Sequence, residues 1–136
     1  MPHRDGGAPA IVCTNGDQQW IVDGEQHRED DLPAIILVQH GKVWLHRGRR
    51  HRKGDKPAFE HANGDVEYWM FGMRHRGNGL PAVIHVGGRQ EWWVCGVLHR
   101  EGDLPAIIEA DGTKRWFMCD VPYREGGIPI ELGPLF

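Results

Sequence analysis

A histidine followed by an arginine recurs along the chain, and side chains of these two types could bind a metal ion or an anion. Imidazole is a common zinc ligand, and the guanidinium fork matches carboxylates and phosphates. The pairs follow one another at a constant step of 24 residues: His3-Arg4, His27-Arg28, His51-Arg52, His75-Arg76 and His99-Arg100, with Tyr123-Arg124 in the sixth position. What these two columns can do depends on the elements that position them.

Other residue types keep the same step of 24 residues. Proline recurs at 9, 33, 57, 81, 105 and 129, followed by alanine except before Ile130. An aromatic residue recurs at Trp20, Trp44, Tyr68, Trp92 and Trp116, and glycine recurs at Gly24, Gly48, Gly72 and Gly96, with Asp120 breaking that series. A fixed period without insertions is typical of a repeat protein. We therefore expect a single repeat domain over residues 1–136, with five full repeats and a partial one.

Each repeat predicts two short strands joined by a tight turn. In one repeat these are "AIILV" at 34–38 and "VWLHR" at 43–47. Asn15-Gly16, Asn63-Gly64 and Asp111-Gly112 are hairpin signals, because these residues tolerate the positive φ of primed turns. A second glycine before the His-Arg pair marks another reversal, and Gly or Pro interrupts every helical window. The predicted fold is all-β: an elongated, single-layer antiparallel meander of about five stacked β-hairpin repeats.

Two stretches resemble the unit of the MORN repeat family, whose repeats form elongated antiparallel sheets of stacked hairpins. They are "GDVEYWMFGMRHRGNG" at 64–79 and "GTKRWFMCDVPYREGG" at 112–127, with "HR" where the family has "HG". The phrase "HRxxxxPA" departs from the usual motif and is similar to a divergent form found in bacterial, phage and large-virus proteins. The resemblance implies a scaffold or binding module, such as a phage or viral anti-defence protein or an antitoxin. It carries no catalytic residue over to this chain.

The predicted stacking argues against a metal site in the histidine column. Equivalent residues in successive hairpins lie roughly 10 Å apart, whereas zinc ligands lie about 2 Å from the ion. We expect His and Arg to bond turn carbonyls and nearby acids, such as Glu29, Asp31, Glu101 and Asp103. The chain has no serine, and its three cysteines, Cys13, Cys95 and Cys119, lack CxxC spacing, which predicts free thiols. We therefore expect no metal, no cofactor and no catalytic residue.

The aromatic column predicts a core, but the position after it is apolar as well. Since neighbours along a strand point to opposite faces, both faces of the second strand are apolar. Trp69 and Trp93, with Phe71 and Met73, form the richest patch on the second face. This patch is either packed between repeats or exposed to a partner or a second copy, so a homodimer is expected under the second interpretation.

The sharpest departure from the repeat is "HRGRRHRK" at 46–53, where the preceding repeat has "VDGEQHRE". It carries five positive charges: Arg47, Arg49, Arg50, Arg52 and Lys53. The stretch is either a solvated turn face or an electropositive patch for an acidic protein, a phosphate-bearing ligand or a nucleic-acid backbone.

The whole-chain charge narrows the function classes. The formal net charge is −3, with 16 basic and 19 acidic side chains, which argues against nucleic acid and anionic lipid as partners of the whole protein. No apolar run is long enough to span a membrane, and the start "MPHRDGGAPA" lacks a signal-peptide core, so a cytoplasmic location is expected. The sequence predicts a non-enzymatic binding or inhibitor module that engages another protein through the aromatic face and the basic stretch. The alternative is a protein that binds a small ligand or nucleotide through the His/Arg columns, with hydrolysis as the weaker form.

Overall fold

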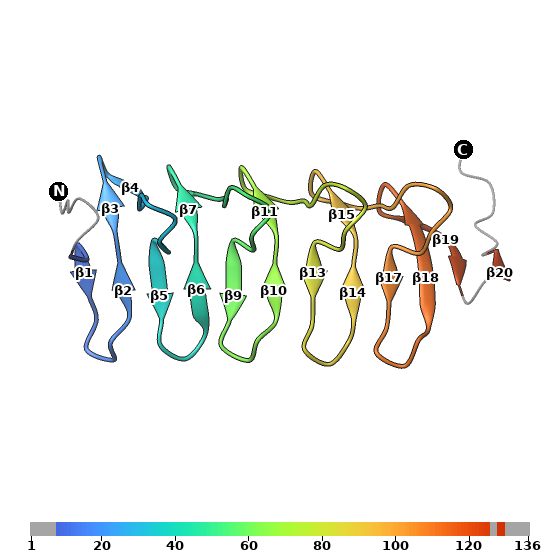
Figure 1. Cartoon of the computed structure of the whole chain (residues 1–136), viewed down its shortest axis with the longest axis horizontal. Helices are drawn as coiled ribbons and strands as arrows, with labels where there is room; N and C mark the ends of the chain where they lie inside the picture. Colours follow the sequence, from blue (N-terminus) through green and yellow to red (C-terminus); the bar gives the residue numbers. More distant parts are fainter. Residues whose placement is uncertain (1–7, 126–127, 130–136) are drawn as a thin grey trace. The chain divides into compact units, whose positions relative to one another are not determined.

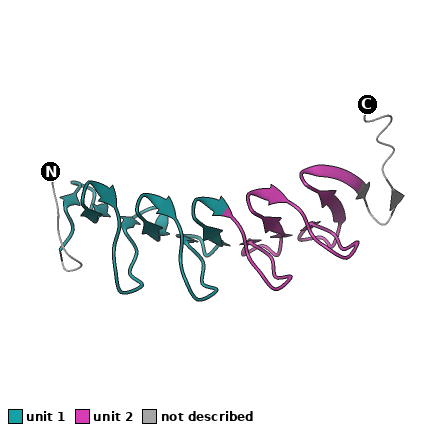
Figure 2. Cartoon of the chain, turned by 90° about the horizontal axis from the view of Figure 1, so that it is seen from above, with its two compact units in different colours: residues 1–73 teal, residues 74–136 magenta. Residues whose placement is uncertain are grey.

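Short antiparallel strands form all the regular structure that the computed structural model describes, which covers residues 8–125 and 128–129. No helix occurs within that range, which confirms the all-β prediction. The His3-Arg4 pair and Ile130 lie outside the described residues. Two compact units divide the chain at residues 73 and 74 (Figure 2), and each is described by itself. The single repeat domain over 1–136 stays a prediction.

In unit 1, Met1–Met73, a meander sheet runs through three long hairpins (Figure 1). Its strands, in sheet order, are β1 (Ile11–Val12), β2 (Gln18–Gln19), β5 (Ile35–Leu37), β6 (Gly41–Val43), β9 (Phe59–His61) and β10 (Val66–Glu67). A second, smaller hairpin follows each long one: β3 (Ile21–Val22) with β4 (Glu25–Gln26), and β7 (Leu45–His46) with β8 (Arg49–Arg50). The strand β11 (Trp69–Met70) begins the third, and β12 (Met73–Arg74) lies at the division between the units.

Unit 2, Arg74–Phe136, repeats this plan. Its meander strands are β13 (Val83–Ile84), β14 (Gln90–Glu91), β17 (Ile107–Ile108), β18 (Lys114–Met118), β19 (Val121–Glu125) and β20 (Ile128–Pro129). The small hairpin β15 (Trp93–Val94) and β16 (Val97–Leu98) stands beside this sheet. Up to β15 the predicted long second strand is thus broken at the aromatic column, and its remainder pairs with the segment before the His-Arg pair. In the last repeat β18 runs through Trp116 without a break, and its pairing with β19 shifts register between Trp116 and Phe117.

The two hairpin types use different turns, and here the sequence assignment needs a correction. At Asn15-Gly16 the chain does reverse, but only Gly16 has a positive φ, of 99°. The last hydrogen bond of the hairpin runs from the Cys13 N–H to the Asp17 carbonyl. Residues 14–16 therefore form a three-residue loop, in which the glycine makes a bulge. The two-residue primed turns occur instead in the small hairpins, as at Arg47 and Gly48, with φ values of 49° and 79°. The second glycine therefore marks the tighter reversal.

The core lies in the corner between the meander and the small hairpins. Trp20, Trp44, Trp92 and Trp116 are each at most 7% exposed, which confirms the aromatic column as core at these four positions, whereas Tyr68 of the same column is half-buried. The alanine after the proline is fully buried in four repeats, as at Ala58, whose carbonyl accepts the backbone N–H of Trp44, whereas Ala10 is half-buried. A larger side chain at that position would meet closely packed backbone, which explains why alanine recurs there.

Candidate functional site

The arginine column forms a structural clamp at positions 28, 52, 76 and 100, where each guanidinium donates to the carbonyl of the proline five residues later. The Arg52 guanidinium lies 3.8 Å from the Trp44 ring centroid, and its Nη1 donates to the Pro57 carbonyl at 3.1 Å. Arg100 repeats this arrangement on Trp92 and the Pro105 carbonyl. The indole Nε1 of Trp44 in turn donates to the carbonyl of Asp31 in the preceding loop. The predicted bonding of arginine to turn carbonyls is confirmed.

The histidine column joins each repeat to the next one through the primed turn. His27 Nδ1 accepts the backbone N–H of Arg47 at 3.1 Å, and His51 Nδ1 accepts that of Phe71 at 3.2 Å. The predicted acidic partners are present at the other nitrogen, since His27 Nε2 donates to Glu29. The predicted carbonyl contact is replaced by a backbone N–H, so Nδ1 must stay unprotonated. Among the described residues, no group of three or more His, Cys, Asp or Glu side chains could hold a metal ion.

Residues that differ from the repeat pattern are therefore the better candidates for a functional role, and the largest differences lie at 46–56. The column of His46 otherwise holds valine or methionine, and the column of Lys56 holds leucine at 32, 80 and 104. Lys53 stands where three other described repeats have Glu29, Glu101 and Glu125, and where a fourth has Gly77. Because the other repeats fold without these polar and basic residues, stability alone does not require them.

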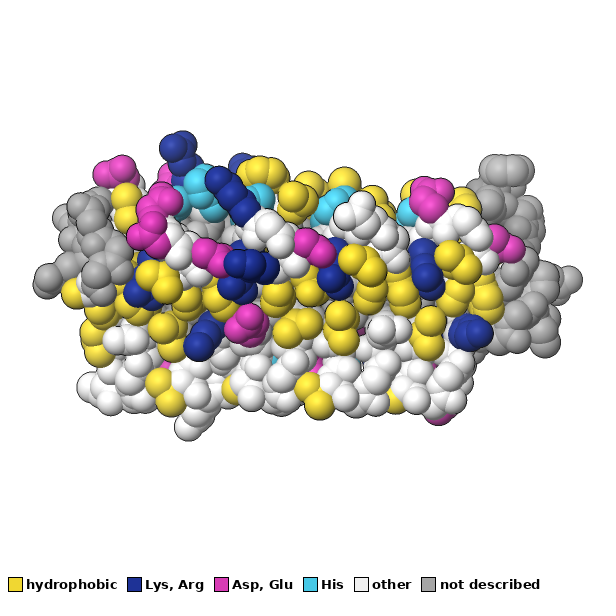
Figure 3. All heavy atoms as spheres, in the orientation of Figure 1, with side chains coloured by type: hydrophobic (Ala, Val, Ile, Leu, Met, Phe, Trp, Pro, Cys, Tyr) yellow, Lys and Arg dark blue, Asp and Glu magenta, His cyan; other side chains and the backbone are white. Residues whose placement is uncertain are grey.

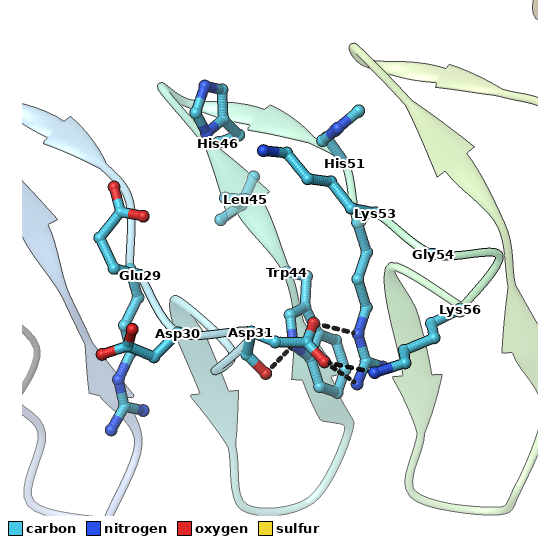
Figure 4. Close-up of a pocket in the computed structure, with 12 residues that line it drawn as sticks. Glu29, Asp30, Asp31, Trp44, Leu45, His46, His51, Lys53, Gly54 and Lys56 are labelled. Carbon is cyan, nitrogen blue, oxygen red and sulfur yellow. Dashed lines mark hydrogen bonds and ion pairs between the residues drawn. The ribbon is translucent and has the colours of Figure 1, made fainter.

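These departures surround a pocket of about 420 Å³ in unit 1. One wall is the loop of residues 28–31 and the other is the loop of residues 51–56, with Trp44 and Leu45 between them. Figure 4 shows the Lys53 side chain extending toward His46, with His51 beside it and Lys56 directed toward Asp31. In Figure 3 basic, acidic and histidine side chains gather over the small hairpins of this unit.

The two walls of the pocket differ in their electrostatics. Hydrogen bonds from Arg52 and then Lys56 lower the pKa of Asp31 to about 2. The carboxylate is therefore ionised, and the positive charges of these two neighbours balance its negative charge. Burial, followed by the charges of His27 and Arg47, lowers the pKa of His46 below its usual value. Burial and then His46 and Lys53 lower the pKa of His51 as well. Both imidazoles are therefore neutral at pH 7 and can each donate one N–H.

The histidines form a cluster on the upper side of this pocket. The ring centroid of His46 lies 4.7 Å from that of His27 and 6.0 Å from that of His51. His51 is 8% exposed, and no hydrogen bond is recorded at its Nε2 among the described residues. His51 also lacks the carboxylate that faces His27, because Lys53 occupies that column. The cluster thus leaves N–H donors available beside an ammonium group.

The five residues of the predicted basic stretch separate into two groups. Arg47, Arg49 and Lys53 are exposed, and no ion pair with a carboxylate is recorded for them in the described part of the chain. Arg50 lies over the Trp69 ring, 4.8 Å from its centroid. Arg52 is held inside the clamp, with further ion pairs to Asp31 and Glu60. We call Arg47, Arg49 and Lys53 the basic turn.

The predicted aromatic residues are placed differently from one another. Trp69 and Trp93 are half-buried, and each indole N–H donates to a glutamate two residues earlier. Phe71 is 55% exposed and stacks on the His51 ring with centroids 4.2 Å apart. Met73 is also exposed. Phe71 therefore offers an apolar surface next to the histidine cluster, while Trp93 belongs to unit 2.

Sequence reasoning missed His46 and Lys56 as site residues, and it assigned Glu29 and Asp31 only to the scaffold. A column-by-column comparison contained the signal, because leucine at 32, 80 and 104 marks Lys56 as a departure. The cysteines are free and exposed, as expected. No helix among the described residues is long and apolar enough to cross a membrane.

The chain was also compared with models of protein families, with curated proteins and with solved structures. None of the three comparisons found a match. The resemblance to MORN repeats stays a prediction about the repeat unit.

Proposed function

We propose that this protein is a non-enzymatic binding module that engages an acidic surface of another protein through its basic turn. The observation that supports this most directly is the departure from the repeat. Arg47 and Arg49 are exposed in the small hairpin β7–β8, where other repeats have Asp23, Glu25 or an apolar residue. Such unpaired surface charges attract an oppositely charged surface and steer its approach.

Phe71 gives this surface an apolar component. It lies in the primed turn after β11, and Gly72 of the same turn lies against the Arg49 side chain. An exposed aromatic side chain flanked by arginine matches the composition of interface centres. The basic turn and Phe71 therefore form a mixed surface within unit 1.

The His/Arg columns give less support to the alternative, ligand-binding function. The donors of Arg28 and Arg100 are used on proline carbonyls, and the Nδ1 atoms of His27 and His51 are used on backbone N–H groups. A ligand at the columns would have to compete with these bonds. Contact through the basic turn breaks none of them.

The test is fluorescence anisotropy with a labelled poly-glutamate peptide at low and at physiological salt. We expect Arg47→Asp with Arg49→Glu to weaken binding by more than tenfold at low salt, because two attractions become repulsions. Both replacements are residues of the same columns in another repeat, at Asp23 and Glu25, so the fold tolerates them. Raising the salt should weaken the wild type more than the variant.

A matched control separates the basic turn from net charge. Lys114→Glu changes the net charge by the same amount as Arg49→Glu but lies in β18 of unit 2. We expect Lys114→Glu to bind the peptide like the wild type. Equal weakening by Lys114→Glu and Arg49→Glu, or unchanged binding by the double variant, refutes the proposal.

A further inference from the structure

We propose that the pocket beside the basic turn is a phosphate site, and that the partner presents a phosphorylated side chain to it. This inference rests on the proposed function, since the pocket and the basic turn share Lys53. The group recognised is a phosphate monoester on a protein segment, held by Lys53, His46 and His51.

Lys53, His46 and His51 carry hydrogen-bond donors that the scaffold does not use. Lys53 replaces the glutamate of its column, and no ion pair with a carboxylate is recorded for its ammonium group in the described residues. His46 replaces valine or methionine, and no hydrogen bond of its ring is recorded there either. His51 is 8% exposed and lines the pocket with its Nε2 unused. One donor from β7, His46, and two from the 51–56 loop, His51 and Lys53, thus meet at one pocket.

These donors suit a phosphate monoester better than a carboxylate. A carboxylate is best matched by the planar fork of arginine, but both arginines that line the pocket, Arg28 and Arg52, already bond proline carbonyls. The remaining donors are one ammonium and two imidazole N–H groups, which act as separate points. A phosphate monoester has three terminal oxygens and close to two negative charges at neutral pH, so it can accept from all three donors at once.

The charge balance of the pocket is positive. Its lining includes Arg28, Arg52, Lys53 and Lys56 against Glu29, Asp30 and Asp31, a net charge of +1 with neutral histidines. Asp31 is bonded to Arg52 and Lys56, and Glu29 is bonded to His27. Of the three acids that line the pocket, Asp30, in the opposite wall, is the one with no recorded partner. An anion beside Lys53 and His46 therefore meets the positive side of the pocket, with Arg47 adjacent.

Apolar side chains lie next to these donors. Leu45 is 8% exposed at the base of the pocket, and Phe71 stacks on His51 behind the cluster. Hydrogen bonds to a charged group are stronger where neighbouring apolar groups exclude water. Phe71 can also contact the chain that carries the phosphate, which favours a protein segment over a free ion.

The experiment follows the histidine imidazole resonances by NMR while inorganic phosphate, a phosphoserine peptide and the same peptide with glutamate are added in turn. We expect phosphate and the phosphoserine peptide to shift His46 and His51, with His75 and His99 as internal controls in unit 2. The phosphoserine peptide should bind at least tenfold more tightly than the glutamate peptide. Equal affinity of these two peptides, or shifts spread evenly over all histidines, overturns the proposal.

Two variants test the donors and separate this inference from the proposed function. His46→Val places the residue of Val22 and Val94 in the column, and it should weaken phosphopeptide binding about tenfold, the loss of one charge-assisted hydrogen bond. It should leave poly-glutamate binding to the basic turn unchanged. Lys53→Glu should abolish phosphopeptide binding, whereas Lys114→Glu should not alter it.

The outcomes are distinct. If His46→Val binds the phosphopeptide like the wild type, the phosphate site is wrong even when the basic turn is right. If a 5′-phosphorylated oligonucleotide binds the pocket more tightly than the phosphopeptide, the assignment to a protein segment is wrong. Loss of poly-glutamate binding on its own concerns only the proposed function.

Discussion

Removing the arginine of one clamp gives the most direct test of how the repeats are held together. In Arg100→Ala the Pro105 carbonyl loses its charged donor at 3.1 Å, and the Trp92 ring loses the cation 3.8 Å from its centroid. An orphaned buried acceptor costs about 1–3 kcal/mol, and a partly desolvated cation–π contact contributes about 1 kcal/mol. We therefore expect the free energy of unfolding to fall by about 3 kcal/mol.

Arg52→Ala removes the same two contacts and two ion pairs in addition. The pairs join Arg52 to Asp31 at 2.8 Å and to Glu60 at 3.2 Å. Both carboxylates are 41% exposed, so solvent screens these pairs and each contributes less than about 1 kcal/mol. The expected loss is about 4 kcal/mol, and the difference from Arg100→Ala should shrink at high salt.

Urea unfolding followed by far-UV circular dichroism and by tryptophan fluorescence measures both variants. Arg100→Lys is the informative control, because lysine keeps the charge but cannot place a planar fork between the indole and the carbonyl. It should recover less than half of the loss. A decrease below about 1 kcal/mol in both alanine variants would show that the clamp contributes little, and it would refute the structural role assigned to the arginine column.

The protonation of His51 and of Asp31 and the packing around Ala58 can each be tested by unfolding. Burial lowers the folded-state pKa of His51, so the unfolded chain binds protons more readily than the folded one. The melting temperature should be highest above the unfolded pKa of about 6.5 and should fall as the pH decreases below that value. An unchanged melting temperature between pH 7 and pH 5 would contradict this. Asp31 has a folded pKa of about 2 against an ordinary value of 3.8. Its contribution to the free energy of unfolding is therefore present above pH 3.8 and is lost as the pH falls through 2. In Asp31→Asn the free energy of unfolding, measured by fluorescence, should depend less on pH in that window. Ala58→Leu should cost at least about 1–3 kcal/mol in urea unfolding, because Ala58 is fully buried and has no room for three added carbons, whereas the same change at exposed Ala62 serves as the control.

The period of the sequence predicted most of the fold, because a repeated hairpin must bury repeated residues. Trp44 is core for the reason that its column indicated, whereas the burial of the alanine column, as at Ala58, was not predicted. The small hairpins were predicted only as reversals, since strands of two residues such as β7 are too short to show an alternating pattern. The primed turns were assigned to Asn15-Gly16 rather than to Arg47-Gly48, because arginine is a poor sequence signal for positive φ.

The candidate site could be predicted less completely. The contiguous run of charge at 46–53 drew attention to Arg47 and Arg49, and these are exposed. Arg52 belongs to the same run but also to the arginine column, and it is held in the clamp as the column predicted. His46 and Lys56 add to the pocket through the approach of two loops from successive repeats, and no spacing within one repeat indicates that approach.

One consequence of the primed turn concerns how this architecture can diversify. The first turn residue contributes its backbone N–H to the histidine of the preceding hairpin, and its side chain projects outward, as with Arg47, Phe71 and Cys95. The contact that holds the turn is therefore made by a backbone N–H, which every residue except proline has, and it does not depend on the identity of the side chain. The first turn residue of each repeat could therefore be randomised to present different side chains at regular positions while the backbone of the repeats is kept.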